Sequence, residues 1–129
     1  MTKQTKYSQK TIKPWGWEIL FTPENLPYAG KILFVKAGKR LSLQYHDQKQ
    51  ETLSLLKGKA NLILENEKGK MVSLMMIPKN GYTINQGKKH RLEAITDCLI
   101  IEASTPEIGK TYRIEDDYNR KNEKLTEKS

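Results

Sequence analysis

Short segments in which hydrophobic and polar residues alternate, separated by turns, fill the chain from residue 15 to residue 103. Side chains of a strand alternate between two faces, so this period of two predicts β-strands, and hardly any stretch has a helical period. The predicted strands are 15–21, 31–36, 40–46, 52–56, 60–65, 72–77, 82–84, 90–94 and 98–103. Many short strands at spacings of about 8 to 12 residues predict an all-β sandwich or barrel.

The apolar residues concentrate between Ile32 and Ile101, so the 129 residues are expected to form a single domain around one core. Residues 1–10 and 119–129 are polar and weakly periodic, which predicts flexible tails around a folded domain at 11–118. The single cysteine, Cys98, lies in an apolar run and is expected to be a buried, inert thiol in a reducing compartment.

The formal net charge of +8 raises the question of a nucleic-acid partner. The lysines are spread along the whole chain without interleaved aromatic residues, which favours a solvated surface and no nucleic-acid binding. No signal peptide is visible at the start, and no stretch approaches the ~20 apolar residues of a membrane span. We therefore expect a cytoplasmic protein without a membrane partner.

Both histidines of the chain, His46 and His90, lie in glycine-bearing segments that also contain other donors of N or O. Gln44 and His46 are two residues apart and share one strand face. Glu51 is at the start of the next predicted strand, on the same face as the apolar residues that follow it. A carboxylate there is costly to bury unless it is paired or binds a cation. Each residue alone has an ordinary structural explanation, but together Gln44, His46, Glu51 and His90 are a candidate set of ligands for one divalent metal ion.

These segments resemble the motifs of the cupin superfamily. The first cupin motif, G-x5-H-x-H-x(3,4)-E-x6-G, is matched in spacing by Gly38, Gln44, His46, Glu51 and Gly58, with Gln in place of the first His. The second, G-x5-P-x-G-x2-H-x3-N, is matched only at its end by Gly87 and His90, with Ala94 at the Asn position. The resemblance implies a double-stranded β-helix, a jelly-roll barrel, as the fold.

The chain is more closely similar to type II mannose-6-phosphate isomerases, including the cupin half of bifunctional isomerase and mannose-1-phosphate guanylyltransferases. The shared segments are Lys-Pro-Trp-Gly at 13–16, Gly-Lys-Arg-Leu-Ser-Leu-Gln-Tyr-His at 38–46, 87–91, and the late Arg-x-Glu-Asp-Asp-Tyr-x-Arg at 113–120. A Gln as first ligand is itself typical of this group. Asp47, Gln48 and Lys49 replace the usual His and Arg residues. No nucleotidyltransferase domain accompanies the cupin, so guanylyltransferase activity is not inferred.

The resemblance implies an enzyme that interconverts mannose 6-phosphate and fructose 6-phosphate by moving a proton between C1 and C2. One divalent ion on Gln44, His46, Glu51 and His90 would act as Lewis acid; the donors favour Zn, while Fe, Ni, Co and Mn are compatible. Glu51 and Arg91 are the implied catalytic residues. The candidate phosphate anchors are Lys39, Arg40, Lys88, Lys89 and Arg91. The catalytic base stays open among Glu18, Glu93 and Glu102.

Two other functions fit the same scaffold, because a fold does not fix an activity. One is a non-catalytic metal-cupin that binds a sugar phosphate or another small acid, and the other is a metal-dependent dioxygenase. The acidic run 115–117, beside Arg113 and Arg120, is expected to form a surface ion-pair network. A homodimer is expected because exposed edge strands need cover.

Overall fold

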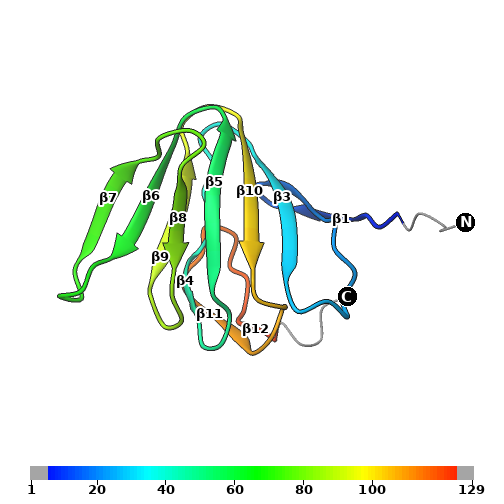
Figure 1. The fold of residues 1–129 in the computed structure, drawn as a ribbon. Helices are drawn as coiled ribbons and strands as arrows, with labels where there is room; N and C mark the ends of the chain where they lie inside the picture. Colours follow the sequence, from blue (N-terminus) through cyan, green and yellow to red (C-terminus); the bar gives the residue numbers. More distant parts are fainter. Residues whose placement is uncertain (1–5, 125–129) are drawn as a thin grey trace, which may run out of the picture.

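The computed structural model describes residues 6–124, which fold into twelve β-strands arranged as two six-stranded antiparallel sheets and no helix (Figure 1). The first sheet has the order β1 (Gln9–Lys13), β2 (Gly16–Leu20), β3 (Ala29–Val35), β10 (Cys98–Ser104), β5 (Glu51–Lys57) and β8 (Gly81–Ile84). The second has the order β12 (Glu123–Lys124), β11 (Lys110–Glu115), β4 (Leu43–His46), β9 (His90–Ala94), β6 (Ala60–Glu65) and β7 (Met71–Met75).

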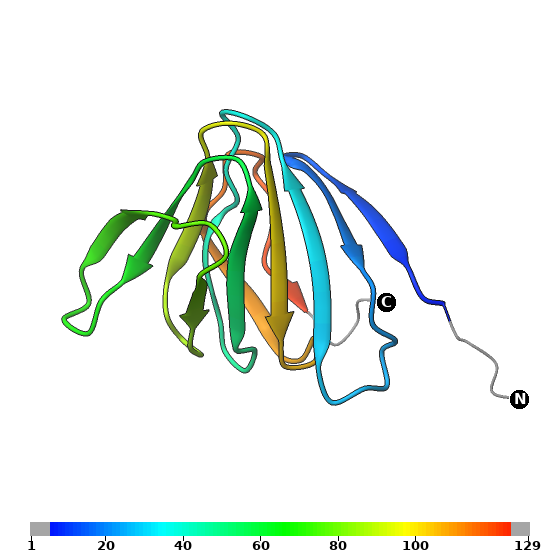
Figure 2. The same cartoon turned by 45° about the horizontal axis from the view of Figure 1, so that its top comes forward.

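Neighbouring strands within each sheet are mostly distant in the sequence, since the chain passes repeatedly from one sheet to the other. β3 is followed by β4 in the second sheet and β5 in the first, and β8, β9 and β10 alternate in the same way. Figure 2 shows the two sheets facing each other around a common interior. This arrangement confirms the predicted all-β jelly roll.

The core lies between the two sheets and is built from the inward-facing residues of alternating strands. Leu53 and Leu55 of β5 face Leu62 and Leu92 across the interior, and all four are almost completely buried. Cys98 is also part of this core, and its burial raises the pKa of the thiol. The prediction of a buried cysteine is therefore confirmed.

The strands extend beyond the predicted domain bounds at both ends. β1 begins at Gln9, within the predicted N-terminal tail, and β12 lies within the predicted C-terminal tail. β11 was not predicted as a strand, although it pairs with β4 between Thr111 and Glu115. The remaining tail predictions for 1–5 and 125–129 lie outside the described residues.

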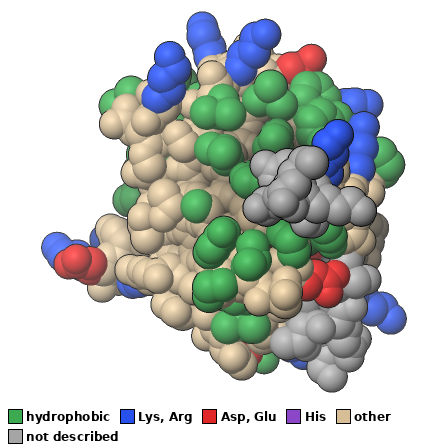
Figure 3. Space-filling model, turned by 45° about the vertical axis from the view of Figure 1, so that its right-hand side comes forward, with side chains coloured by type: hydrophobic (Ala, Val, Ile, Leu, Met, Phe, Trp, Pro, Cys, Tyr) green, Lys and Arg blue, Asp and Glu red, His purple; other side chains and the backbone are tan. Residues whose placement is uncertain are grey.

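Hydrophobic side chains are also exposed on the surface. Figure 3 shows hydrophobic side chains gathered at the centre of the face that it presents. Ile12, Phe21 and Tyr28 are among the exposed hydrophobic residues of the chain. Met71, Val72 and Met75 are exposed on the edge strand β7. The predicted homodimer stays a prediction that light scattering would test. Within residues 6–124, the structure contains no helix of the length and hydropathy needed to cross a membrane.

Candidate metal centre and its cavity

Strands β4 and β11 point polar residues toward the interior and apolar residues outward, the reverse of an ordinary sandwich strand. Gln44 and His46 face the cavity, whereas Tyr45 stacks on Tyr112 on the other face, with ring centroids 4.8 Å apart. Thr111 lies directly opposite His46 on the neighbouring strand. The inversion indicates that this part of the interior is a polar site and not core.

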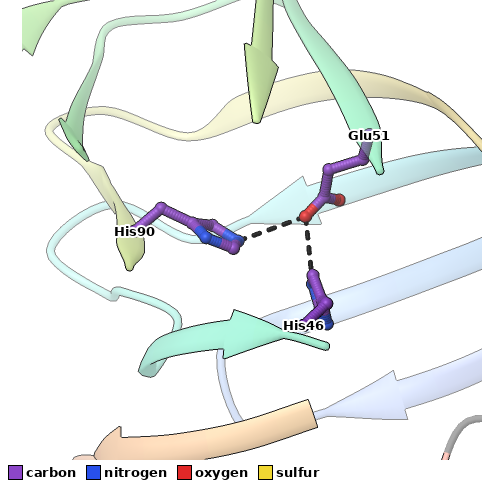
Figure 4. A group of neighbouring side chains, drawn as sticks. All are labelled: His46, Glu51 and His90. Carbon is purple, nitrogen blue, oxygen red and sulfur yellow. Dashed lines mark hydrogen bonds and ion pairs between the residues drawn. The ribbon is translucent and has the colours of Figure 1, made fainter. Parts of the chain in front are cut away.

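Three side chains from three strands converge on one point between the sheets (Figure 4). His46 Nε2 and His90 Nε2 each lie 3.1 Å from the same carboxylate oxygen, Glu51 Oε1. All three side chains are 5% exposed, and one ligand atom of each lies within 4.8 Å of the others. The structure thus brings together three of the four ligands that the sequence predicts.

The second nitrogen of each imidazole is bound by the protein, which orients the first. His90 Nδ1 lies 3.0 Å from the carbonyl oxygen of Lys88, which can only accept, so Nδ1 carries the proton. His46 Nδ1 lies 2.8 Å from Thr111 Oγ1. Such outer contacts are typical of metal-binding histidines because they fix the tautomer and direct the free lone pair inward.

With Nδ1 protonated, His90 Nε2 faces the acceptor Glu51 Oε1 at 3.1 Å, a contact that is favourable only when a proton or a cation lies between the two atoms. His90 Nε2 is buried and makes no hydrogen bond among the described residues, although it lies within ion-pair distance of Glu51. Two buried acceptors in contact are unfavourable unless a positive charge lies between them. A divalent cation satisfies this requirement, so the residues present fit a metal.

The protonation states of the ligands also suit a metal, which binds neutral imidazole and ionised carboxylate. Burial lowers the pKa of His46, so the ring is neutral at neutral pH. Burial alone would raise the pKa of Glu51, but the charge of Lys49 and the contacts with His46 and His90 hold it well below its usual range. Glu51 is therefore ionised.

Gln44, the fourth predicted ligand, lies beside this cluster. Its Oε1 accepts a hydrogen bond from Ser42 Oγ at 2.6 Å, and its Nε2 lies 3.5 Å from His46 Nε2. A half-turn of the amide exchanges the two atoms and would direct the oxygen toward the cluster, while the Ser42 hydroxyl, which donates and accepts, keeps a partner. Gln44 is thus placed for the predicted role without a change of backbone.

A buried network of lysines and glutamates lies beside the cluster on the first sheet. Lys49 Nζ is 2.8 Å from Glu102 Oε2, 3.4 Å from Glu107 Oε2 and 3.9 Å from Glu51 Oε2. Lys31 pairs with Glu18 at 3.2 Å and also contacts Glu107. Counting Lys13, which lies 4.0 Å from Glu18, four carboxylates face three ammonium groups.

The excess of carboxylates has a visible consequence at Glu102. Burial and next the charge of Glu51 raise the pKa of Glu102 to about 8, against the opposing charges of Lys49 and Lys31. Without a cation at the cluster, Glu102 therefore keeps its proton at neutral pH. A divalent ion on His46, Glu51 and His90 would offset the same excess of negative charge.

The cluster and the network both line one cavity of about 370 Å³ between the sheets. Its wall on the first sheet carries Glu18, Glu51 and Glu102, and its wall on the second carries the histidines, Thr111 and Arg113. A cavity of this size accommodates a small molecule. Of the three candidate bases, Glu18 and Glu102 line it, whereas Glu93 lies outside and pairs with Arg40 at 3.3 Å.

The structure does not bring the five predicted phosphate anchors together. Lys39, Arg40, Lys88 and Lys89 are not among the residues that line the cavity, and Arg40 pairs with Asp117 at 2.7 Å. Arg91 is on the cavity wall, but strand alternation turns its side chain to the opposite face from His90. There its guanidinium donates to Leu41 O at 2.9 Å and to Glu115 O at 3.1 Å.

The ion-pair network expected at the C-terminal arm is present in part. Asp116 accepts from Arg120 at 3.0 Å, and Asp117 pairs with Arg40 from a distant segment. Arg113, in contrast, does not join it: its Nη2 pairs with Glu123 at 2.9 Å.

Several site residues were not predicted from the sequence, namely Lys31, Lys49, Glu107 and Thr111. Lys49 and Glu107 lie in the connections before β5 and after β10, where no hydrophobic periodicity predicts that a residue is buried. Thr111 could have been found, since Thr111 and Arg113 alternate with Tyr112 and Ile114 in the same inverted pattern as β4.

The fold is that of a cupin, and His46, Glu51 and His90 form a candidate metal site within it. More narrowly, the chain belongs to the family described as Mannose-6-phosphate isomerase C-terminal, whose model it matches over residues 1–123. Among curated protein sequences, none matches this chain.

Solved structures share the fold at low sequence identity. Oxalate decarboxylase of Bacillus subtilis is similar with 16% identity and a TM-score of 0.74, over 88% of this chain and 33% of that one. For oxalate decarboxylase of Lactobacillus farciminis the values are 18%, 0.70, 84% and 35%. For the capsular polysaccharide assembling protein CapF of Staphylococcus aureus they are 14%, 0.70, 94% and 32%. This chain spans about a third of each.

Proposed function

We propose that the protein is a metal-dependent aldose–ketose isomerase that interconverts mannose 6-phosphate and fructose 6-phosphate. The observation that carries the proposal is the convergence of His46, Glu51 and His90 on one point of a cavity, in a chain of the mannose-6-phosphate isomerase C-terminal family. The buried Nε2 of His90, which makes no hydrogen bond among the described residues, supports a cation at this point.

One divalent ion would be held by His46, Glu51 and His90, with Gln44 as fourth ligand. When bound, such an ion supplies Lewis-acid stabilisation of the negative charge that develops on the sugar oxygens. The imidazole and carboxylate donors suit zinc. Manganese is an alternative, since oxalate decarboxylase of Bacillus subtilis, which shares the fold, has Mn(II) centres.

Proton transfer between C1 and C2 requires a base in the cavity, and Glu102 is the residue we assign to it. Its side chain is buried in the cavity wall, and its carboxylate has a pKa near the operating range because of burial. Lys49, 2.8 Å away, stabilises the ionised form of Glu102. The guanidinium of Arg91 lies on the face of β9 opposite to His90. It fixes the backbone at Glu115 and adds a positive charge near the site.

The proposal is tested by metal analysis of the purified protein together with an assay of mannose 6-phosphate turnover. Formation of fructose 6-phosphate is followed as glucose 6-phosphate through added phosphoglucose isomerase. His46→Ala and Glu51→Gln should lose both metal and turnover. Glu67→Gln, which removes an exposed carboxylate from the turn between β6 and β7, is the matched control and should retain both.

Other outcomes identify the alternatives. Bound metal with no turnover of any hexose phosphate would overturn the isomerase and favour a metal-cupin that only binds a sugar phosphate or another small acid. Oxygen consumption with an organic acid would instead indicate a dioxygenase. A protein that takes up no divalent metal would contradict all three functions.

A further inference from the structure

Arg113 of β11 is a buried arginine in the cavity wall that has one donor without a partner. Its side chain is 9% exposed. One terminal nitrogen donates to the carbonyl oxygen of Lys121, and the other pairs with Glu123 at 2.9 Å. Its Nε is buried and has no hydrogen-bond partner among the described residues. A buried N–H of a charged group without an acceptor is unfavourable, so this donor points to a ligand that is absent from the free protein.

The register of the second sheet places this arginine next to the candidate metal centre. Arg113 lies directly opposite Gln44, and Thr111 lies opposite His46 on the same pair of strands. Directly opposite residues of antiparallel strands point to the same face, with Cβ atoms about 5 Å apart. A molecule that contacts the cluster is therefore within reach of the guanidinium.

The charges of the cavity favour an anion at this wall over any other. The ammonium groups on the wall of the first sheet are already in ion pairs with carboxylates that outnumber them, so this wall offers no excess positive charge to an anion. Lys13, Lys31 and Lys49 face Glu18, Glu51, Glu102 and Glu107. Arg120 is bound to Asp116 through two nitrogen atoms, and Arg91 directs its guanidinium to the far face. Arg113 is the cavity arginine that combines an inward position with an unpaired donor.

We propose that Arg113 binds the anionic end of the substrate, a phosphate monoester, and that Glu123 occupies this place on the guanidinium until the ligand arrives. Guanidinium groups bind phosphate through parallel hydrogen bonds, and a phosphate dianion competes well with a single carboxylate. The identity of the ligand as a sugar phosphate rests on the proposed function. The position of the anion site rests on Arg113 itself.

A purely structural Arg113–Glu123 pair predicts a different outcome from an anion site. If the pair only holds β12 against β11, then removal of either partner should have the same effect on the cavity. If Arg113 binds an anion, removal of the arginine weakens binding, whereas removal of the competing Glu123 carboxylate strengthens it. The sign of the Glu123→Gln effect therefore separates the two.

The test is isothermal titration of the full, metal-loaded chain with inorganic phosphate and with mannose 6-phosphate. Arg113→Gln should weaken both by about tenfold to a hundredfold, as expected for loss of a charged hydrogen bond, with metal content unchanged. Arg113→Lys keeps the charge and should weaken both less. Glu123→Gln should tighten both by about twofold to fivefold. Lys57→Gln, an exposed lysine outside the cavity, controls for net charge and should change neither.

Equal weakening by Arg113→Gln and Glu123→Gln would overturn the inference, as would unchanged binding in Arg113→Gln or a wild-type protein that binds neither phosphate. Should Arg113→Gln fail to fold, the Arg113→Lys and Glu123→Gln results still decide the outcome. Failure of the proposed function looks different: wild type would bind mannose 6-phosphate more tightly than mannose, in an Arg113-dependent way, without turnover.

Discussion

The two walls of the cavity are built in different ways. The second sheet supplies Gln44, His46, Thr111 and His90 from regular strand positions, each fixed by alternation and register. The first sheet supplies Glu51 and Glu102, whose charges are balanced by Lys49. Lys49 also pairs with Glu107, and both residues come from connections between strands. A wall made from strand positions is set by the fold itself. A wall made from buried ion pairs depends on every partner being present, since a single unpaired charge is costly.

The largest effect that would sharpen this contrast is expected for Lys49→Met. The change leaves Glu51, Glu102 and Glu107 without their shared counter-ion, so we expect the free energy of unfolding to fall by about 3 to 5 kcal/mol. Urea denaturation of the metal-free protein measures it. Lys57→Met, at an exposed position of β5, should stay within about 0.5 kcal/mol of wild type. Equal stabilities of the Lys49 variant and wild type would show that the buried carboxylates do not depend on Lys49 as their counter-ion.

The second prediction concerns the pH dependence of the same wall. Burial raises the pKa of Glu102 to about 8, so the folded protein holds a proton that the unfolded chain releases from about pH 4.5 upward. This group therefore lowers stability as the pH rises from about 4.5 to 8. In Glu102→Gln, which has no proton to lose, stability should fall less over this range. The comparison uses thermal unfolding of both proteins in chelator, and identical pH profiles would refute it.

The smallest effect is expected on the opposite wall, for Thr111→Val. The variant removes the hydroxyl that orients His46 but leaves all ligands in place, so metal affinity should fall by about tenfold. Competition with a fluorescent chelator measures the change, and Thr111→Ser, which keeps the hydroxyl, should retain wild-type affinity. A loss as complete as that of His46→Ala would mean that Thr111 does more than orient the ring.

The contrast between the walls also explains what the sequence could predict. Alternation was enough to place Gln44 and His46 on one face, and the spacing to Glu51 and His90 supplied the rest of the cluster. The anchors Lys39 and Arg40 were proposed because they adjoin the ligand segment in sequence, yet β4 begins only at Leu43, and Arg40 pairs with Glu93 and Asp117 outside the cavity. The inward-facing Arg113 lies in β11, where the polar residues face the interior and the apolar residues face outward. This inverted alternation was not recognised as a strand of the barrel.

Burial in the connections could not be predicted for a different reason. Lys49 and Glu107 are charged residues in turns, where exposure is the ordinary outcome. Their burial follows from ion pairs with residues 53 and 58 positions away. Only the assembled sheets reveal such partners.

The turn before β9 has a consequence for how the protein folds. Gly87 adopts a positive φ of 78°, and its N–H donates to the carbonyl oxygen of His46 at 2.7 Å. This contact joins segments about 40 residues apart, as does the pairing of Gln44 with His90. Contacts of such long range form slowly, because loop closure precedes any gain from them. Capture of metal by a refolding chain should therefore report the closing of the barrel and not the formation of any single hairpin.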